Sequence, residues 1–211
     1  SAVHRLAEAD ARRALEIDPN SHSAWSALIE SNGGACGDEW LDNNAGLILF
    51  CERFLVRHPD CHRALHTLIE NLLRDDRFSE ARAYMERFPG VLLPYETVLY
   101  TGDICFGSGD HAAALEHWDR AVSDHPSIWQ VWCCRADRLK KLGQCEQALA
   151  DYERSYAVQQ SPRLIDGLYS RAQLFEQLGR YGEAAAERRR IVQVLADEYG
   201  STEGPWIDLQ I

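Results

Sequence analysis

A short motif returns along this chain at a nearly constant interval and restricts its fold more than any other feature. A glycine stands five residues before an alanine at Gly109 and Ala114, and the same pair returns 34 residues later and again after a further 36 residues. An earlier copy has Asp76 in place of the glycine, five residues before Ala81. A period of about 34 residues is that of a helix-turn-helix repeat, so we expect an array of paired helices.

Each period contains two segments with apolar residues at every third or fourth position, which is typical of amphipathic helices. In the period from 129 to 160, the first segment carries Trp132 and Ala136, and the second carries Ala148 and Tyr152. The glycine or aspartate between the segments can adopt the left-handed backbone conformation that ends a helix. Small residues such as Ala136 and Ala148 would let the two helices approach closely where they cross.

These residues together resemble the tetratricopeptide repeat family, in which a large residue, a small residue, an aromatic residue, two alanines and a proline recur at fixed places. Pro19, Pro59 and Pro126 match the proline that closes a unit. The resemblance covers nearly the whole chain and implies an all-α fold, a right-handed superhelical α-solenoid. We expect a lone second helix at 2–17, repeats at about 22–61, 62–94, 95–128, 129–164 and 165–199, and the start of a further helix at 201–211.

The repeat at 22–61 is about six residues longer than its neighbours. Its polar segment from Ser31 to Asn43 contains Gly33, Gly34 and Gly37, and we expect an irregular loop there. Such an insertion is either a tolerated surface loop or a ligand contact, and the sequence leaves both open.

Charge and cysteine content exclude several classes of protein. Lys and Arg total 22 against 33 Asp and Glu, a formal net charge of -11, which argues against nucleic acid because phosphate binding needs clustered cations. No apolar run approaches the roughly 20 residues that span a bilayer, so we expect no membrane segment. The odd number of cysteines, without a CxxC pair, predicts free thiols and a cytoplasmic protein. The seven are Cys36, Cys51, Cys61, Cys105, Cys133, Cys134 and Cys145.

The sequence offers weak candidates for a phosphate or metal site. The run GGACG at 33–37 lacks the Lys-Ser or Lys-Thr of a phosphate loop. Cys61, His62 and His66 form the best metal-like cluster, since the two histidines lie one helical turn apart, but no fourth ligand is evident. We therefore expect no metal and no cofactor.

Reactive thiols and anion sites are equally weak. Cys133 and Cys134 are adjacent on a helix, so they point about 100° apart and cannot act as a pair. No Cys-His-Asn or Ser-His-Asp order stands out, and we expect no enzyme activity in this segment. The arginines at 12–13 and 188–190 could meet an anion, but acidic residues close by on the same helix, such as Glu187, favour ion pairs.

The remaining candidate is the inner groove that first helices line in this family. Residues at places 5 and 9, counted from the start of each repeat, share one face of the helix. Place 9 is acidic in four repeats, with Glu30, Glu70, Asp103 and Asp137. The groove residues that we expect to meet a ligand are Glu30, His66, Glu70, Leu99, Asp103, Phe106, Cys133, Asp137, Tyr169 and Gln173.

The chemistry of this face indicates the partner. Family members that bind the acidic carboxyl termini of heat-shock chaperones carry Lys and Asn at places 5 and 9, and this chain lacks that clamp. Stacked carboxylates beside Leu99, Phe106 and Tyr169 fit a basic or mixed basic-apolar protein segment, although the acids could also be merely solvated. We expect a protein-interaction scaffold that belongs to a longer protein. The alternatives are a non-catalytic regulatory or substrate-presenting arm of a larger enzyme and an RNA reader, which the acidic groove disfavours.

Overall fold

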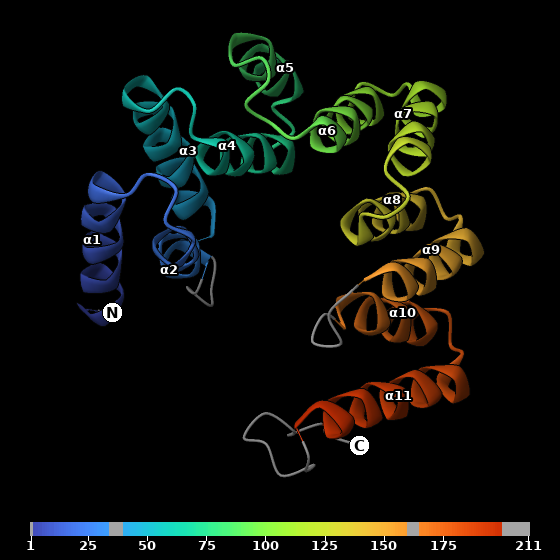
Figure 1. Cartoon of the computed structure of the whole chain (residues 1–211). Coiled ribbons are helices and arrows are strands. Elements are labelled where there is room, and N and C mark those ends of the chain that lie inside the picture. The colour runs from blue at the N-terminus through green and yellow to red at the C-terminus, as the bar shows by residue number, and fades with distance from the viewer. Residues whose placement is uncertain (1, 34–39, 160–164, 200–211) are drawn as a thin grey trace. The chain divides into compact units, whose positions relative to one another are not determined.

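A computed structural model describes residues 2–33, 40–159 and 165–199 of the chain. These described residues form eleven helices and no strand, so the all-helical expectation is confirmed. Figure 1 labels the helices in chain order. The helices are α1 (Ala2–Ile17), α2 (His22–Gly33), α3 (Trp40–Arg57), α4 (His62–Arg74), α5 (Phe78–Arg87), α6 (Pro94–Gly107), α7 (His111–Asp124), α8 (Trp129–Lys141), α9 (Cys145–Val158), α10 (Asp166–Gln177) and α11 (Tyr181–Tyr199).

The helices pack in consecutive pairs within two compact units. Unit 1 is Ser1–Leu115 and unit 2 is Glu116–Ile211, so the division falls inside α7. The first helices of the pairs are α2, α4, α6, α8 and α10, and each second helix follows its first helix in the chain. In unit 1, α1 packs on α2, and α4 contacts both α5 and α6; in unit 2, α9 packs between α8 and α10. This arrangement is that of a helical repeat.

Four turns between paired helices share one backbone geometry. Gly109, Gly143 and Gly179 have φ angles of 85°, 75° and 72°, and Asp76 has a φ of 58°. In each turn the next residue donates its N–H to the carbonyl five positions earlier, which caps the preceding helix. These bonds are Arg77 to Leu72, Asp110 to Cys105, Gln144 to Leu139 and Arg180 to Phe175, at 2.8 to 2.9 Å. The left-handed turns expected from the repeat are therefore confirmed.

Small residues lie where paired helices cross. Ala136 of α8 and Ala148 of α9 are both fully buried, and Ala172 and Ala184 are nearly so in α10 and α11. A methyl group at these places leaves room for the backbones to approach, while large side chains fill the space on either side. In unit 2, Tyr152 is one of these large residues and is fully buried.

The structure corrects the loop expected from Ser31 to Asn43. Helix α2 continues through Gly33, and α3 begins at Trp40, so residues at both ends of that segment are helical. Adding a residue to an existing helix gains a backbone hydrogen bond at little extra cost, which favours such extension. The middle of the expected loop, which includes the GGACG run beyond Gly33, lies outside the described residues. The further helix expected at 201–211 also lies outside them. Among the helices that are described, none is long and apolar enough to cross a membrane.

Candidate functional site

In unit 1 the first helices α4 and α6 form one face, which we call the first-helix face, and a buried carboxylate lies between them. Glu96 lies in the first turn of α6, its side chain is 7% exposed, and its Oε2 accepts a hydrogen bond from the Leu93 N–H at 3.0 Å. The Nε2 atoms of His62 and His66, both on α4, lie 2.6 Å and 3.4 Å from its two oxygens. Glu96 thus joins α4 to α6 and is not available to a ligand.

Two other acidic residues of this face are more accessible. Glu70 follows His66 by one turn of α4, and its side chain is 51% exposed, with the carboxylate 3.6 Å from His66 Nδ1. Asp103 is half-buried at the equivalent place of α6. Phe106 is half-buried one turn further along, with its ring centroid 4.8 Å from that of His111. Unit 1 therefore carries a face with two carboxylates, a histidine and the edge of an aromatic residue.

Of two further residues expected in the groove, one is buried and the other has a side chain outside the described part of the structure. Leu99 is 3% exposed, so its side chain belongs to the core and not to a ligand surface. Burying a leucine is worth about 1.5 to 3 kcal/mol relative to leaving it exposed, which explains why it turns inward. Glu30 is in α2, but its side chain lies outside what the structure describes.

The equivalent face of unit 2 uses its polar groups internally. The hydroxyl of buried Tyr152 donates to Asp137 Oδ1 at 2.5 Å, and Lys140 Nζ lies 3.8 Å from the same oxygen. The Asp137 side chain still remains 52% exposed. The thiol of Cys133 lies 2.9 Å from the Ser155 hydroxyl; burial raises the pKa of Cys133 to about 12, while that hydrogen bond lowers it. A thiol with this pKa is a poor nucleophile at neutral pH.

The last two expected groove residues come from α10. Tyr169 is half-buried and packs against the cluster of Ile165, Leu168 and Ile191. Gln173 is exposed and occupies place 9, which holds an acidic residue in the earlier repeats. The series of carboxylates therefore ends before α10. Within unit 2, this face offers one partly satisfied carboxylate beside neutral groups.

Unit 2 also contains two arginine clamps that the sequence analysis missed. Arg135 of α8 donates to both oxygens of buried Asp151 on α9, at 2.6 and 2.7 Å, and to Asp119 of α7 at 2.9 Å. Its guanidinium also lies 5.3 Å from the ring centroid of Trp132. Burial alone would lower the pKa of Arg135, but the hydrogen bonds and charges of the two aspartates raise it. One side chain therefore ties three consecutive helices together.

The second clamp repeats the first at the equivalent place. Arg171 of α10 donates to Glu153 of α9 at 2.7 Å and to Glu187 of α11 at 2.6 Å. Arg190 also donates a hydrogen bond to Glu153. This hydrogen bond, together with the positive charges of Arg190 and Arg171, holds the pKa of Glu153 below its ordinary value. The signal was present in the sequence, because an arginine and its two acidic partners return together after one period.

Comparison with known proteins identifies the repeat. A family model described as tetratricopeptide repeat matches residues 135–197, which span parts of α8 and α11 and all of α9 and α10. Residues 135–197 of the chain therefore match the tetratricopeptide repeat family. A comparison with curated protein sequences gives no match.

Solved structures with a similar fold include tetratricopeptide repeat proteins of low sequence identity. A monomeric IFIT1 mutant with Gppp-AAAA is 14% identical, with a TM-score of 0.52, and the match covers 90% of this chain and 46% of that one. A human IFIT1 dimer with m7Gppp-AAAA is 16% identical, with a TM-score of 0.50 and coverage of 90% and 45%. MamA is 15% identical, with a TM-score of 0.47 and coverage of 78% and 98%. The chain thus spans under half the length of IFIT1, and the likeness concerns the fold alone.

The metal-like residues of the chain have separate partners. The buried Cys61 thiol donates to the Pro19 carbonyl at 3.2 Å, whereas His62 and His66 face Glu96. In the described part of the chain, no group of three or more His, Cys, Asp or Glu side chains could hold a metal ion. These residues connect α4 to the chain before α2 and to α6.

The cysteines of the described residues are free thiols, as the sequence predicted for them. They are Cys51, Cys61, Cys105, Cys133, Cys134 and Cys145. Burial raises the pKa of Cys51 and of Cys61, because a thiolate loses hydration in the apolar core. Cys36 lies outside the described residues.

Proposed function

We propose that this tetratricopeptide repeat protein is a protein-interaction scaffold whose first-helix face in unit 1 binds a basic or mixed basic-apolar segment of another protein. One observation carries the proposal. Glu70 and Asp103 occupy the same place on the neighbouring helices α4 and α6, and the Glu70 side chain is half exposed. Like charges held at equivalent places of packed helices repel each other, and a cationic side chain between them relieves this repulsion.

The surroundings of the two carboxylates support a partner with both cationic and apolar groups. His66 is 22% exposed beside Glu70, and its ring packs edge-on against Tyr100 at a centroid distance of 5.8 Å. Phe106 lies on α6 beyond Asp103 and is only half-buried. A segment with an arginine or lysine next to an apolar residue would place a positive charge beside the carboxylates and cover the partly exposed ring.

Unit 2 has a smaller role in this proposal. The carboxylate of Asp137 already accepts a hydrogen bond from Tyr152 and lies close to Lys140. A cationic ligand would therefore gain less there than at Glu70. The groove that we propose is centred on α4 and α6. The division of the chain into five repeats after a lone helix is likewise a proposal.

Phosphate-containing ligands fit this face poorly. The IFIT1 structures are described with capped tetraadenylate ligands, but those ligands belong to IFIT1. In this chain the formal net charge is -11, and the face presents Glu70 and Asp103 instead of clustered cations. Nucleic-acid affinity depends on neutralising phosphates with Lys and Arg, so a protein partner is favoured.

A peptide-binding assay tests the proposal directly. The probe is a fluorescein-labelled peptide of alternating arginine and leucine, and the matched peptide has serine in place of arginine. Anisotropy should rise with the arginine peptide only, and binding should weaken with added salt because exposed charges are screened over about 8 Å at physiological ionic strength. The variant E70K/D103K should lose at least about tenfold in affinity, since two attractions become repulsions.

The control variant E86K/E116K makes the same change of net charge on exposed residues of α5 and α7. It should bind the arginine peptide almost as wild type does. Equal losses in both variants would mean that only the overall charge matters, and unchanged binding by E70K/D103K would place the site elsewhere. Far-ultraviolet circular dichroism of each variant verifies that the helices are intact.

A further inference from the structure

A second surface of unit 1 has the opposite chemistry. Large hydrophobic side chains are exposed at a few positions of the described residues: Ile17, Leu49, Val56, Leu93, Leu178 and Tyr181. Half of these lie on α1 and α3, with exposures of 87% for Ile17, 45% for Leu49 and 72% for Val56. Isolated exposed apolar residues need no explanation, but several on adjoining helices mark an interaction surface.

The exposed residues of α3 form one stripe. Leu49, Arg53, Val56 and Arg57 follow one another at the spacings that place side chains on one face of a helix, and all four are exposed. The other face of α3 is in the core, where Phe54 is 1% exposed. Apolar and cationic side chains therefore alternate along a helix surface that no described segment covers.

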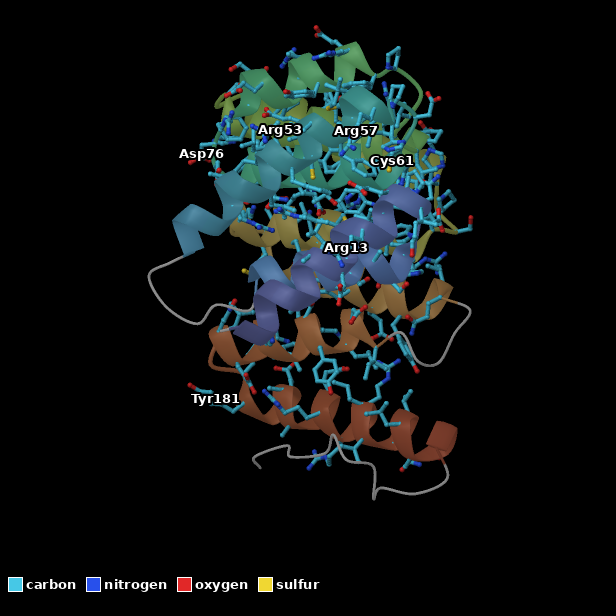
Figure 2. All side chains as sticks on the ribbon, turned by 90° about the vertical axis from the view of Figure 1, so that its left-hand side faces the viewer. Arg13, Arg53, Arg57, Cys61, Asp76 and Tyr181 are labelled. Carbon is cyan, nitrogen blue, oxygen red and sulfur yellow. The ribbon has the colours of Figure 1, made fainter. Side chains whose placement is uncertain are left out.

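Helix α1 lies beside this stripe. The guanidinium of Arg12 stacks over the ring of Phe50 on α3, 5.2 Å from its centroid, and Arg57 lies 4.0 Å from Glu16. Figure 2 shows Arg13 on α1 and Arg53 and Arg57 on α3, all on the side of unit 1 that faces the viewer. We call Arg13, Ile17, Leu49, Arg53, Val56 and Arg57 the α1–α3 patch.

The arginines of the patch are available for a partner. In the described part of the chain, no carboxylate pairs with Arg13 or Arg53. The ion pair of Arg57 among the described residues, with Glu16, joins side chains that are 58% and 63% exposed, and such exposed pairs are weak. Ion pairs were expected for the arginines at 12–13, and Arg13 forms none with the described residues. Cations without partners are notable in a chain with a formal net charge of -11.

We propose that the α1–α3 patch binds an acidic amphipathic helix of a partner protein. Carboxylates of that helix would bind Arg13, Arg53 and Arg57, and its apolar residues would cover Ile17, Leu49 and Val56. Arginine suits this task because its planar guanidinium binds a carboxylate through two hydrogen bonds. This binding is separate from the proposed recognition of basic segments, which uses the first helices α4 and α6 and depends on carboxylates.

The charges around the patch favour a protein helix over a uniformly anionic surface. Glu16 stands beside Arg57 within the surface, so a membrane or a nucleic-acid backbone would bring phosphates close to a carboxylate. A helix with spaced acidic residues can avoid Glu16 while it pairs with the arginines. The patch also holds no exposed aromatic side chain to anchor in a lipid interface, since Phe50 is half-buried under Arg12.

The test uses the complete chain and a designed peptide. The probe is an 18-residue amphipathic helix with leucine at every third or fourth position and glutamate at the flanking positions. The matched peptide has the same leucines with glutamine in place of glutamate. We expect the glutamate peptide to bind, with an affinity that falls at high salt, and the glutamine peptide to bind at least about tenfold more weakly.

Two variants separate charge from apolar contact. R13E/R53E breaks no ion pair of the described residues, so the fold should persist, and it should lower affinity for the glutamate peptide at least about tenfold. L49S/V56S should lower it about threefold or more, because two exposed aliphatic groups lose the chance of burial. The control R82E/R189E changes the net charge equally at exposed arginines of α5 and α11 and should bind as wild type does.

Several results would overturn the proposal. Unchanged binding of the glutamate peptide by R13E/R53E would show that the patch is not its site. Stronger binding of the chain to vesicles of phosphatidylcholine with phosphatidylserine than to the peptide, lost in R13E/R53E, would assign the patch to membranes. Self-association in analytical ultracentrifugation that the same variant abolishes would assign it to a second copy of this chain. E70K/D103K serves as a further control, since it should leave binding of the glutamate peptide intact.

Discussion

Replacing Arg135 by methionine should destabilise unit 2 far more than the loss of an ordinary surface charge. The Arg135 side chain is 18% exposed, and Asp151, which accepts two of its hydrogen bonds, is 6% exposed. Methionine keeps the length and helix propensity of arginine, so the change removes mainly the charge and the hydrogen bonds. Asp151 is then left as a buried carboxylate without its cation.

The structure sets the size of this effect. Breaking a buried ion pair by removing one partner costs about 3 to 5 kcal/mol, and the remaining exposure of Arg135 places this case near the lower limit, at about 3 kcal/mol. The contact with Asp119 adds little, because that side chain is 63% exposed. Replacing both partners, in R135M/D151L, should restore most of the loss, since no unpaired charge remains.

Urea-induced unfolding, followed by far-ultraviolet circular dichroism, measures these differences. With a slope of about 2 kcal/mol per molar urea, a loss of about 3 kcal/mol lowers the midpoint by about 1.5 M. The control is R120M, because Arg120 lies 3.9 Å from Asp124 and both side chains are more than half exposed. That pair should contribute less than about 0.5 kcal/mol. If R135M and R120M shift the midpoint equally, or if the double variant is no more stable than R135M, the clamp does not act as we describe.

Three further predictions concern pH, thiol reactivity and the turns. Because its arginine partners hold the pKa of Glu153 below the ordinary 4.5, the unfolded state takes up that proton first, so the stability advantage of wild type over E153Q should be present at pH 7, shrink as the pH falls below 4.5 and disappear as the pH falls through the lower pKa of the folded state. Iodoacetamide at pH 7.5 should modify Cys133 at least about a hundredfold more slowly in the folded chain than in urea, because a pKa of about 12 leaves little thiolate. G143A should lower the free energy of unfolding by about 1 kcal/mol, because Gly143 has a φ of 75°. G46A should raise it by about 0.5 to 1 kcal/mol, because Gly46 lies inside α3 with open space around it. Urea midpoints that shift in the same direction for both variants would refute this.

The accessible groups of the candidate site were predicted only in part. The equivalent places of Glu70 and Asp103 follow from counting along the repeat, and both acids lie on the first helices of unit 1. Leu99 and Asp137 were expected on the same ligand surface, but Leu99 is in the core, whereas Asp137 is half exposed and also accepts a hydrogen bond from Tyr152. The repeat pattern predicts the face of a helix, whereas the partner of each side chain depends on a neighbouring helix that lies many residues away.

The amino-acid sequence by itself determined the helical class of this protein, its paired helices and its left-handed turns. These features depend on residues close together in the chain: apolar residues at helical spacing, and a glycine or Asp76 where the backbone reverses. Only the tertiary structure decided which charged groups are used internally and which remain for partners. Arg135 finds Asp151 on the next helix and becomes part of the core, whereas Arg53 finds no carboxylate among the described residues and stays at the surface. Both are arginines within amphipathic helices, and their different roles arise because packing brings an acidic side chain of another helix within hydrogen-bonding distance of only one of them.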